Sequence, residues 1–143
     1  MTFSSIEHGS EAYQQELALR NVVLREPLGL DIMEDDLSKE SNQWHFGLFE
    51  NDKLIACVIA VPHLEKEAQL RQMAVTQTYQ RKGHGREIIL LVEKHLVQKG
   101  IKNLILHARV EVLDFYLKLG YSPVGELFIE VGIPHQKMLK ALT

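Results

Sequence analysis

The chain has 143 residues, which is enough for one domain around a single hydrophobic core, and we expect that domain to span residues 1–143. Hydrophobic residues make up 45% and charged residues 24%, a composition typical of folded globular domains that excludes a disordered or low-complexity chain. The 19 acidic residues outnumber the 16 Lys and Arg residues and give a net charge of −3, which disfavours nucleic acid as the main partner because phosphate contacts need a basic surface.

The only cysteine, Cys57, excludes an internal disulfide and a metal cage built on cysteines. It lies in the apolar run 54–61, where the lack of neighbouring charge favours a buried, unreactive thiol. The first residues do not combine a basic region with an apolar stretch, so no signal peptide is expected. No apolar run approaches the ~20 residues that cross a bilayer, and we expect a cytoplasmic protein with no membrane partner.

The N-terminal part of the chain predicts a helix followed by an irregular connection. Residues 10–24 repeat apolar side chains at helical spacing, and Ser10 is suited to cap the first turn. Pro27 and a nearby glycine break this pattern, so residues 25–30 are expected to form a loop. A short helix is expected over residues 34–37.

The rest of the chain predicts a sheet and two further helices. The expected strands are residues 44–49, 54–61, 69–75, 103–107, 121–128 and 136–142. Helical periodicity is found over residues 86–98 and 110–119. A turn at residues 51–53 joins the first two strands into a hairpin, and the second strand is apolar enough to lie near the centre of the sheet. The helix between the strands at 69–75 and 103–107 indicates a parallel pair, so the sheet is mixed and the class is α/β or α+β.

The segment 73–86, between the third strand and the second helix, carries the strongest functional signal. Helix N-termini present unpaired N–H groups and a positive dipole end, and Gly83 and Gly85 let the backbone approach a ligand closely. Three cations stand in the same loop: Arg81, Lys82 and Arg86. These features suit a diphosphate, although the two glycines alone could equally serve a turn. The P-loop signature is absent, and Ile88 occupies the place of the third glycine of a dinucleotide fingerprint.

Residues 80–85, QRKGHG, resemble the Gln/Arg-x-x-Gly-x-Gly/Ala signature of the GNAT superfamily of N-acetyltransferases. The strand at 70–75 resembles the strand that precedes this loop in the family, and VLDFYLKLGY at 112–121 is similar to its FYxKLGF segment. Residues 132–138 resemble a terminal motif of small bacterial members. The resemblance covers nearly the whole chain in the expected order. It implies a central mixed, mostly antiparallel sheet with a splayed parallel strand pair and flanking helices.

The resemblance also implies an enzyme that moves the acetyl group of acetyl-CoA to a primary amine. In the family, the backbone of the glycine loop holds the CoA pyrophosphate, and the preceding strand pairs with the pantetheine arm and polarises the thioester carbonyl. The corresponding CoA-binding residues here are Met73, Ala74, Val75, Gln80, Arg81, Lys82, Gly83, His84, Gly85 and Arg86. Arg109 stands where many members carry a CoA-contacting asparagine, and an arginine there could reach a phosphate or an acceptor carboxylate.

Tyr116 matches the family's tyrosine beside the thioester sulfur, which implies a general acid for the leaving thiolate. The alternative is an aromatic core residue on an amphipathic helix. Because Cys57 lies on a different strand, we expect direct attack in a ternary complex rather than an acetyl-cysteine intermediate. Gln69 occupies the place of the glutamate base of several members and cannot act as a base. This departure is the best support for the alternative function, a non-catalytic CoA-binding or sensing module.

The remaining candidates for the base are His63, Glu67, Glu130 and His135, or a water chain to solvent. The acceptor pocket is expected to form from residues 25–30, 61–67 and 128–135. Its substrate-binding candidates are Arg25, Glu130 and His135. The seven histidines show no pairing at metal-ligand spacing, so no metal is expected. Many members form homodimers, and the sequence leaves that question open.

Overall fold

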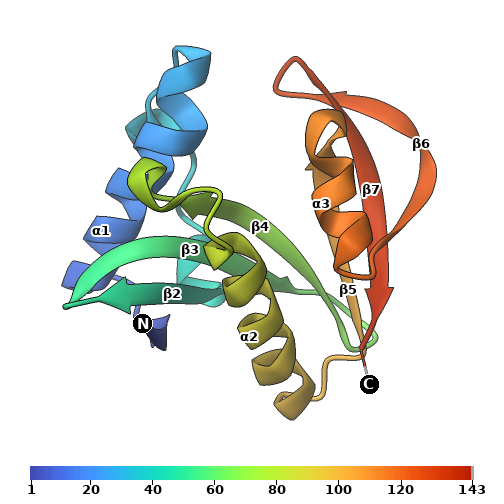
Figure 1. Cartoon of the computed structure of the whole chain (residues 1–143), viewed down its shortest axis with the longest axis horizontal. Helices are drawn as coiled ribbons and strands as arrows, with labels where there is room; N and C mark the ends of the chain where they lie inside the picture. The colour runs from blue at the N-terminus through green and yellow to red at the C-terminus, as the bar shows by residue number, and fades with distance from the viewer. Residues whose placement is uncertain (143) are drawn as a thin grey trace.

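The structure, a computed structural model, describes residues 1–142 and is built on one seven-stranded sheet (Figure 1). The strands are β1 Thr2–Ile6, β2 Trp44–Glu50, β3 Lys53–Pro62, β4 Glu67–Val75, β5 Asn103–Arg109, β6 Ser122–Glu130 and β7 Ile133–Ala141. Their order across the sheet is β1-β2-β3-β4-β5-β7-β6. Only β4 and β5 pair in parallel, and all other neighbours within residues 1–142 are antiparallel. The mixed, mostly antiparallel sheet is therefore confirmed.

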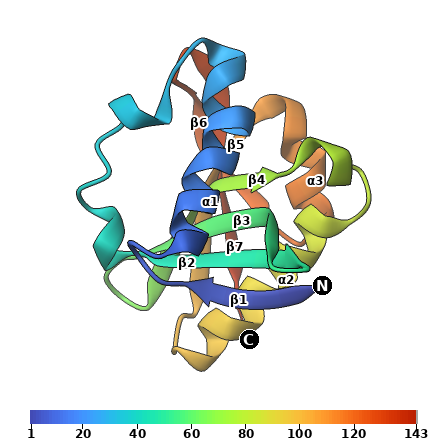
Figure 2. The ribbon, with the colours of Figure 1, turned by 90° about the vertical axis from the view of Figure 1, so that its left-hand side faces the viewer.

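Three α-helices cover the two faces of this sheet (Figures 1 and 2). They are α1 Glu11–Arg20, α2 His84–Gln98 and α3 Leu113–Lys118. Cys57 of β3 packs in one cluster with Tyr13 and Leu17 of α1. The next β3 residue, Val58, points to the opposite face and packs in the cluster that contains Ile88 of α2. No helix in the described part of the chain is long and apolar enough to cross a membrane.

Short helical turns supply most of the remaining connections. They are the π-helix η1 Asn21–Arg25 and the 3-10 turns η2 Glu26–Leu28, η3 Ile32–Glu34, η4 Glu40–Asn42, η5 Gln77–Tyr79 and η6 Val110–Val112. The loop expected over residues 25–30 is thus helical in its first half. The prediction of a helix over residues 34–37 is wrong, because the chain instead makes two separate single turns, η3 and η4. Strand β1 was not expected from the sequence, and it forms by pairing with the edge of β2.

An extra residue bends β4 where the parallel pair separates. Along β3 the register advances by two residues, from Cys57 to Ile59, while along β4 it covers three, from Ala74 to Arg71. The extra residue makes a β-bulge, and Gln72 within it has a left-handed φ of +57°. The parallel ladder between β4 and β5 ends at the next pair, Leu70 with Leu106, and the two strands then diverge (Figure 1). The splayed parallel pair is therefore confirmed, and we call this point the fork.

A buried network of charged side chains fastens α1 to the connection that leads into β2. The Arg20 guanidinium is fully buried and donates to Glu16 at 2.8 Å and to both carboxylate oxygens of Glu40 at 2.8 and 2.6 Å. The Tyr13 hydroxyl donates to Glu40 at 2.7 Å. His45 on β2 completes the network, with Nδ1 2.9 Å from the Glu16 carboxylate and Nε2 2.8 Å from the Glu40 carbonyl oxygen. Residues 21–43 are thereby held at both ends.

Both ring nitrogens of His45 face acceptors, so both donate only when the imidazole is charged. Burial by itself lowers the pKa of His45, but the hydrogen bond to Glu16 and its negative charge outweigh this effect and raise the pKa above its ordinary value. The imidazolium and the Arg20 guanidinium then balance the two buried carboxylates of Glu16 and Glu40, which satisfies the requirement that buried charges be paired.

This network predicts a stability that falls with rising pH. Below about pH 6.5, His45 is charged in both folded and unfolded states and its contribution is complete; the contribution is lost as the pH rises through the higher folded-state pKa. We expect the difference in unfolding free energy between the wild type and His45→Gln to shrink between pH 6 and pH 9, by about 1.4 kcal/mol for every tenfold difference in proton affinity between the two states. Urea unfolding of both proteins at several pH values measures this difference in unfolding free energy. The exposed His63→Gln is the control, and a pH-independent difference for His45→Gln would contradict the prediction.

Candidate functional site

A cavity of about 720 Å³ opens at the fork between β4 and β5. Its walls come from η1 and η2 on one side, from β4 and β5 in the middle, and from η6, α3 and the β6–β7 hairpin on the other side. Seven of the residues expected at the site line it: Arg25, Met73, Gln80, Arg109, Tyr116, Glu130 and His135. Residues from distant parts of the sequence thus meet in one place.

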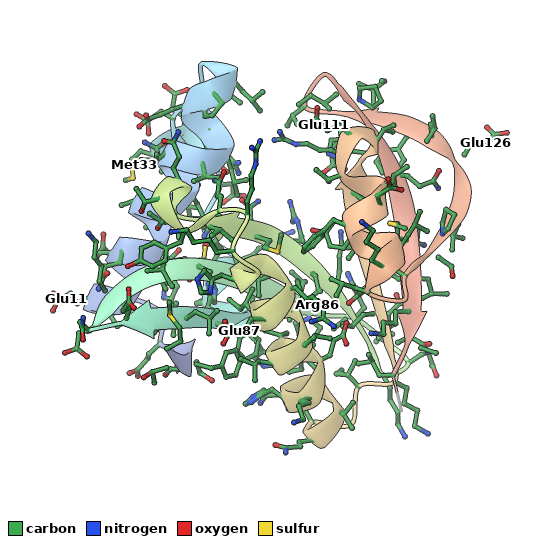
Figure 3. All side chains as sticks on the ribbon, viewed as in Figure 1. Glu11, Met33, Arg86, Glu87, Glu111 and Glu126 are labelled. Atoms are coloured by element: carbon green, nitrogen blue, oxygen red, sulfur yellow. The ribbon has the colours of Figure 1, made fainter. Side chains whose placement is uncertain are left out.

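The glycine loop lies directly after the end of β4 and shapes the start of α2. The Gln80 side chain donates to the Val75 carbonyl oxygen at 2.9 Å and so fastens the loop to the end of the strand. Arg81 and Gly83 have left-handed φ values of +63° and +87°. The first helical bond runs from the Glu87 N–H to the Gly83 carbonyl at 3.0 Å, so the three preceding N–H groups, those of residues 84–86, are left for a ligand. Figure 3 shows Glu87 and Arg86 beside this part of α2.

Two of the expected CoA-binding residues could contribute only through the backbone. The Ala74 side chain is buried in the cluster under α1, on the face away from α2. The His84 ring contacts Glu87 at 3.2 Å and packs edge-on against Tyr79. Met73 follows the bulge and lines the cavity, at a part of β4 where β5 has already moved away.

Tyr116 on α3 reaches the cavity from the face that α2 also covers. Its side chain is half-buried, and its ring packs edge-to-face with Phe115 and Tyr121. Burial raises the pKa of Tyr116 to about 12, so the phenol keeps its proton throughout the neutral range. The residue is therefore both part of the core and a polar donor at the cavity wall.

Arg25 is held on the opposite wall by two partners. Its guanidinium donates to Asp35 at 2.6 Å and to the side-chain oxygen of Gln72, in the bulge, at 3.1 Å. The hydrogen bonds from Arg25 lower the pKa of Asp35, which therefore stays a carboxylate. The η1 segment is in this way tied both to its own connection and to the bulged strand. Figure 3 shows Glu111 on the other side of the opening, near the start of α3.

Glu130 and His135 occur on the β6–β7 hairpin, each with one polar partner. Glu130 accepts a hydrogen bond from His107 of β5 at 2.9 Å. His135 is buried, and its Nδ1 donates to the Ile133 carbonyl at 2.7 Å. The ring of Phe128 packs against both imidazoles.

The other candidate bases lie away from the cavity. On β4 the lining begins at Gln69, so the prediction that residues 61–67 form a wall is wrong. Glu67 stands at the opposite end of the parallel ladder, paired with Asn103. His63 is exposed and contacts the Gln69 side chain at 3.1 Å.

The sequence did not single out several residues that line the cavity. They are Asp35, Arg71, Gln72, His107 and Glu111. One signal could have identified His107. Ligands bind at the carboxyl ends of parallel strands, and the predicted strand 103–107 ends at His107. The others depend on the bulge and on irregular turns, which carry no comparable pattern.

One group of possible metal ligands occurs within residues 1–142, although the histidine spacing did not indicate one. Glu16, Glu40 and His45 each offer an atom within 4.8 Å of the others. Arg20 already stands between the two carboxylates and supplies the positive charge that a cation would bring. The group is therefore suited to hold the fold together, and it lies apart from the cavity residues.

Comparisons with known proteins show which family the chain belongs to. Residues 11–142 match the family model described as the acetyltransferase (GNAT) domain, and the chain belongs to this family. Among curated relatives, YyaT of Bacillus subtilis is 33% identical over 76 residues, and the matched part spans about half the length of each protein, 53% of this chain and 51% of YyaT. The uncharacterized N-acetyltransferase YitI of B. subtilis is 29% identical over 131 residues, covering 87% of this chain and 88% of YitI.

Solved structures show the same fold at low sequence identity. Escherichia coli ElaA superposes with a TM-score of 0.84 at 21% identity, covering 98% of this chain and 99% of ElaA. An aminoglycoside 6'-N-acetyltransferase complexed with coenzyme A superposes with a TM-score of 0.77 at 17% identity, covering 99% and 97% of the two chains. The GNAT acyl-CoA N-acyltransferase fold expected from the sequence is therefore confirmed.

The glycine loop predicts unequal effects for its two glycines. Gly83 has a left-handed φ, and the space that a Cβ would occupy there is open, so Gly83→Ala should lower the unfolding free energy by about 1–2 kcal/mol through backbone strain alone. Gly85 lies in the first turn of α2, where an added Cβ would be 3.4 Å from the Phe115 ring, an ordinary contact. Gly85→Ala should therefore be neutral or slightly stabilising. Urea unfolding of both variants checks this, and equal losses would contradict it.

Proposed function

We propose that this protein transfers the acetyl group of acetyl-CoA, its cosubstrate, to a primary amine by direct attack in a ternary complex. The observation that carries the proposal is the fork, where Met73 of β4, beyond the end of the parallel ladder, and Tyr116 line one cavity. Gln80 of the glycine loop lines the same cavity, and that loop leads into the N-terminus of α2. Membership of the GNAT family supports acetyl transfer in general. We further propose a single cytoplasmic domain over residues 1–143 whose amine acceptor is a small molecule, a peptide or a protein rather than nucleic acid.

The phosphates of acetyl-CoA would bind at the start of α2. The free N–H groups of residues 84–86 and the positive dipole end suit a pyrophosphate. Three cations, Arg81, Lys82 and Arg86, add positive charge around it. The pantetheine arm carries amides, and its extended chain would pair with β4 beyond the bulge as an added strand, beside Met73.

The thioester would then lie in the fork. A backbone N–H of the segment 73–75 would donate to the thioester carbonyl as negative charge develops there, an interaction worth ~2.7–4 kcal/mol in comparable sites. Tyr116 would donate to the departing sulfur. Because its pKa is about 12, the phenol is protonated before the reaction and would pass its proton to sulfur as the carbon–sulfur bond breaks.

Direct attack on the thioester is supported by the surroundings of Cys57. The thiol is buried in the cluster under α1, and its sulfur lies 3.8 Å from the Gln72 carbonyl oxygen. Burial raises the pKa of Cys57 well above its ordinary value, which suppresses the thiolate that an acyl-cysteine route requires. Proximity and orientation of amine and thioester would supply the rate instead.

A non-catalytic CoA-binding or sensing module is the second candidate, because Gln69 in the cavity wall cannot take a proton. A screen of primary amines, including amino acids, peptides, polyamines and aminoglycosides, separates the two when release of CoA from acetyl-CoA is followed. Release with any amine supports the enzyme. Tight binding of acetyl-CoA without release across the panel would favour the module.

Replacing Tyr116 should slow the chemistry without weakening cosubstrate binding. We expect Tyr116→Phe to lower kcat about 100-fold, with the Kd of acetyl-CoA from calorimetry unchanged within about twofold. Tyr121→Phe is the matched control, because its hydroxyl donates to Glu93 at 2.7 Å and lies outside the cavity lining. That control should lower Tm and leave kcat unchanged. A Tyr116→Phe enzyme with full kcat would contradict the role.

Removing the two adjacent cations of the loop should weaken binding only for ligands with phosphates. The double variant Arg81→Ala, Lys82→Ala is expected to raise the Kd of acetyl-CoA about tenfold at low salt, since each exposed charge contributes up to about 1 kcal/mol. Acetylpantetheine, which lacks the nucleotide phosphates, should bind both proteins equally, and the difference for acetyl-CoA should shrink in ~1 M salt. Lys53→Ala, at the start of β3, is the control. Equal weakening of both ligands would contradict phosphate binding at this loop.

A further inference from the structure

His107 is the first residue of β5 beyond the fork. The last parallel pair joins Leu70 to Leu106, so His107 follows it directly, where the thioester of the proposed function would lie. Leu106 and Ala108 pack in the core cluster that contains α2, and side chains alternate along a strand, so His107 points to the opposite face. That is also the face of Gln69, whose neighbour on β5 is Ile105, two residues before His107. His107 therefore lines the same cavity as Gln69, two residues beyond Gln69's partner on β5.

Glu130 fixes which nitrogen of His107 is free. The Nδ1 atom lies 2.9 Å from a Glu130 carboxylate oxygen, and a carboxylate only accepts, so Nδ1 carries the hydrogen. The lone pair of the neutral ring is then on Nε2. The ring also packs edge-to-face on Phe128, with centroids 5.0 Å apart, which limits its rotation. About a third of the His107 side chain is exposed, so the ring remains accessible to a ligand.

His135 is a weaker candidate for proton transfer, although it has the same free nitrogen. It is 6% exposed, and its Nδ1 donates to a backbone carbonyl rather than to a carboxylate. A carboxylate partner orients the imidazole and balances the charge that forms when the ring takes a proton, and Glu130 is such a partner of His107. His135 also stands opposite Arg109, one strand further from the fork.

Other charged or titratable groups lie around His107. They are Arg71 on β4, Arg109 on β5, Glu111 on η6, Glu130 on β6, and His135 and Lys137 on β7. Lys137 lies directly opposite His107 in the β5–β7 register, and its positive charge opposes protonation of the ring. Within this set, only Glu130 is hydrogen-bonded to the ring, so it is the group that fixes the orientation of the imidazole.

We propose that His107 is the general base of the transfer reaction and that Glu130 is its positioning residue; this inference rests on the proposed function. Nε2 takes one proton from the incoming ammonium group and later releases it to solvent. The freed nitrogen forms a bond to the thioester carbonyl carbon, the carbon–sulfur bond breaks, and its electron pair stays on sulfur. Sulfur takes a proton from Tyr116, whose oxygen regains one from the nitrogen of the new amide. The sum is ammonium plus acetyl-CoA giving amide, CoA thiol and one proton.

The pH dependence of kcat/KM tests this assignment, with acetyl-CoA and the amine of the panel that turns over fastest. In the wild type, kcat/KM should rise with pH and level off above the pKa of a histidine, about 6.5. His107→Asn keeps an N–H to donate to Glu130 but has no basic nitrogen. Its kcat/KM should be about 100-fold lower than that of the wild type at pH 7 and should keep rising with pH until the amine itself loses its proton. The amide of Glu130→Gln can bond either form of the ring and no longer fixes which nitrogen is free, so this variant should lower kcat with the KM of the amine unchanged, whereas a raised KM at full kcat would overturn its positioning role.

Two matched histidine variants complete the experiment. His63→Asn, outside the cavity, should retain the wild-type profile. His135→Asn should retain the inflection, and its disappearance in that variant rather than in His107→Asn would overturn the assignment to His107. A levelled profile in folded His107→Asn, checked by circular dichroism, would overturn it as well. Absence of CoA release by the wild type with every amine would instead overturn the proposed function, and the base with it.

Discussion

The separation of β4 from β5 is the constraint on which the rest of the site depends. The parallel ladder has four residue pairs and then stops inside the sheet, so the facing edges of both strands beyond it lack a strand partner within residues 1–142. Backbone N–H and C=O groups need hydrogen bonds wherever water is displaced, and a ligand with amide groups in an extended chain could supply them. The bulge at Gln72 bends β4 away from β5, and the groups of the cavity wall are positioned relative to that bend.

The cavity wall formed by η1 is supported from two directions. The buried network around Arg20 holds the two ends of the connection between α1 and β2, and breaking it would leave charges buried without partners. In the middle of the same connection, Asp35 accepts from Arg25, which also reaches Gln72. The shape of the acceptor side and the bend of β4 are therefore linked by direct hydrogen bonds, and a change in one is transmitted to the other.

The elements with strong local patterns could be predicted from the sequence. The hairpin turn at Asn51 and Asp52 has the left-handed φ values, +51° and +64°, that such turns require, and α2 follows its apolar periodicity. Strand β1 could not be predicted, because a short edge strand is determined by its neighbour more than by its own side chains. The pairing of His107 with Glu130 depends on sheet register between segments 23 residues apart, which single-chain patterns do not specify.

The burial of Cys57 between α1 and the sheet has a practical consequence. Since it is the only cysteine in the sequence, the folded protein presents no accessible thiol, and a colorimetric thiol reagent in solution would report released CoA without background from the protein. The same thiol becomes reactive only when α1 leaves β3 and β4. The rate of Cys57 alkylation would thus measure how often that side of the core opens.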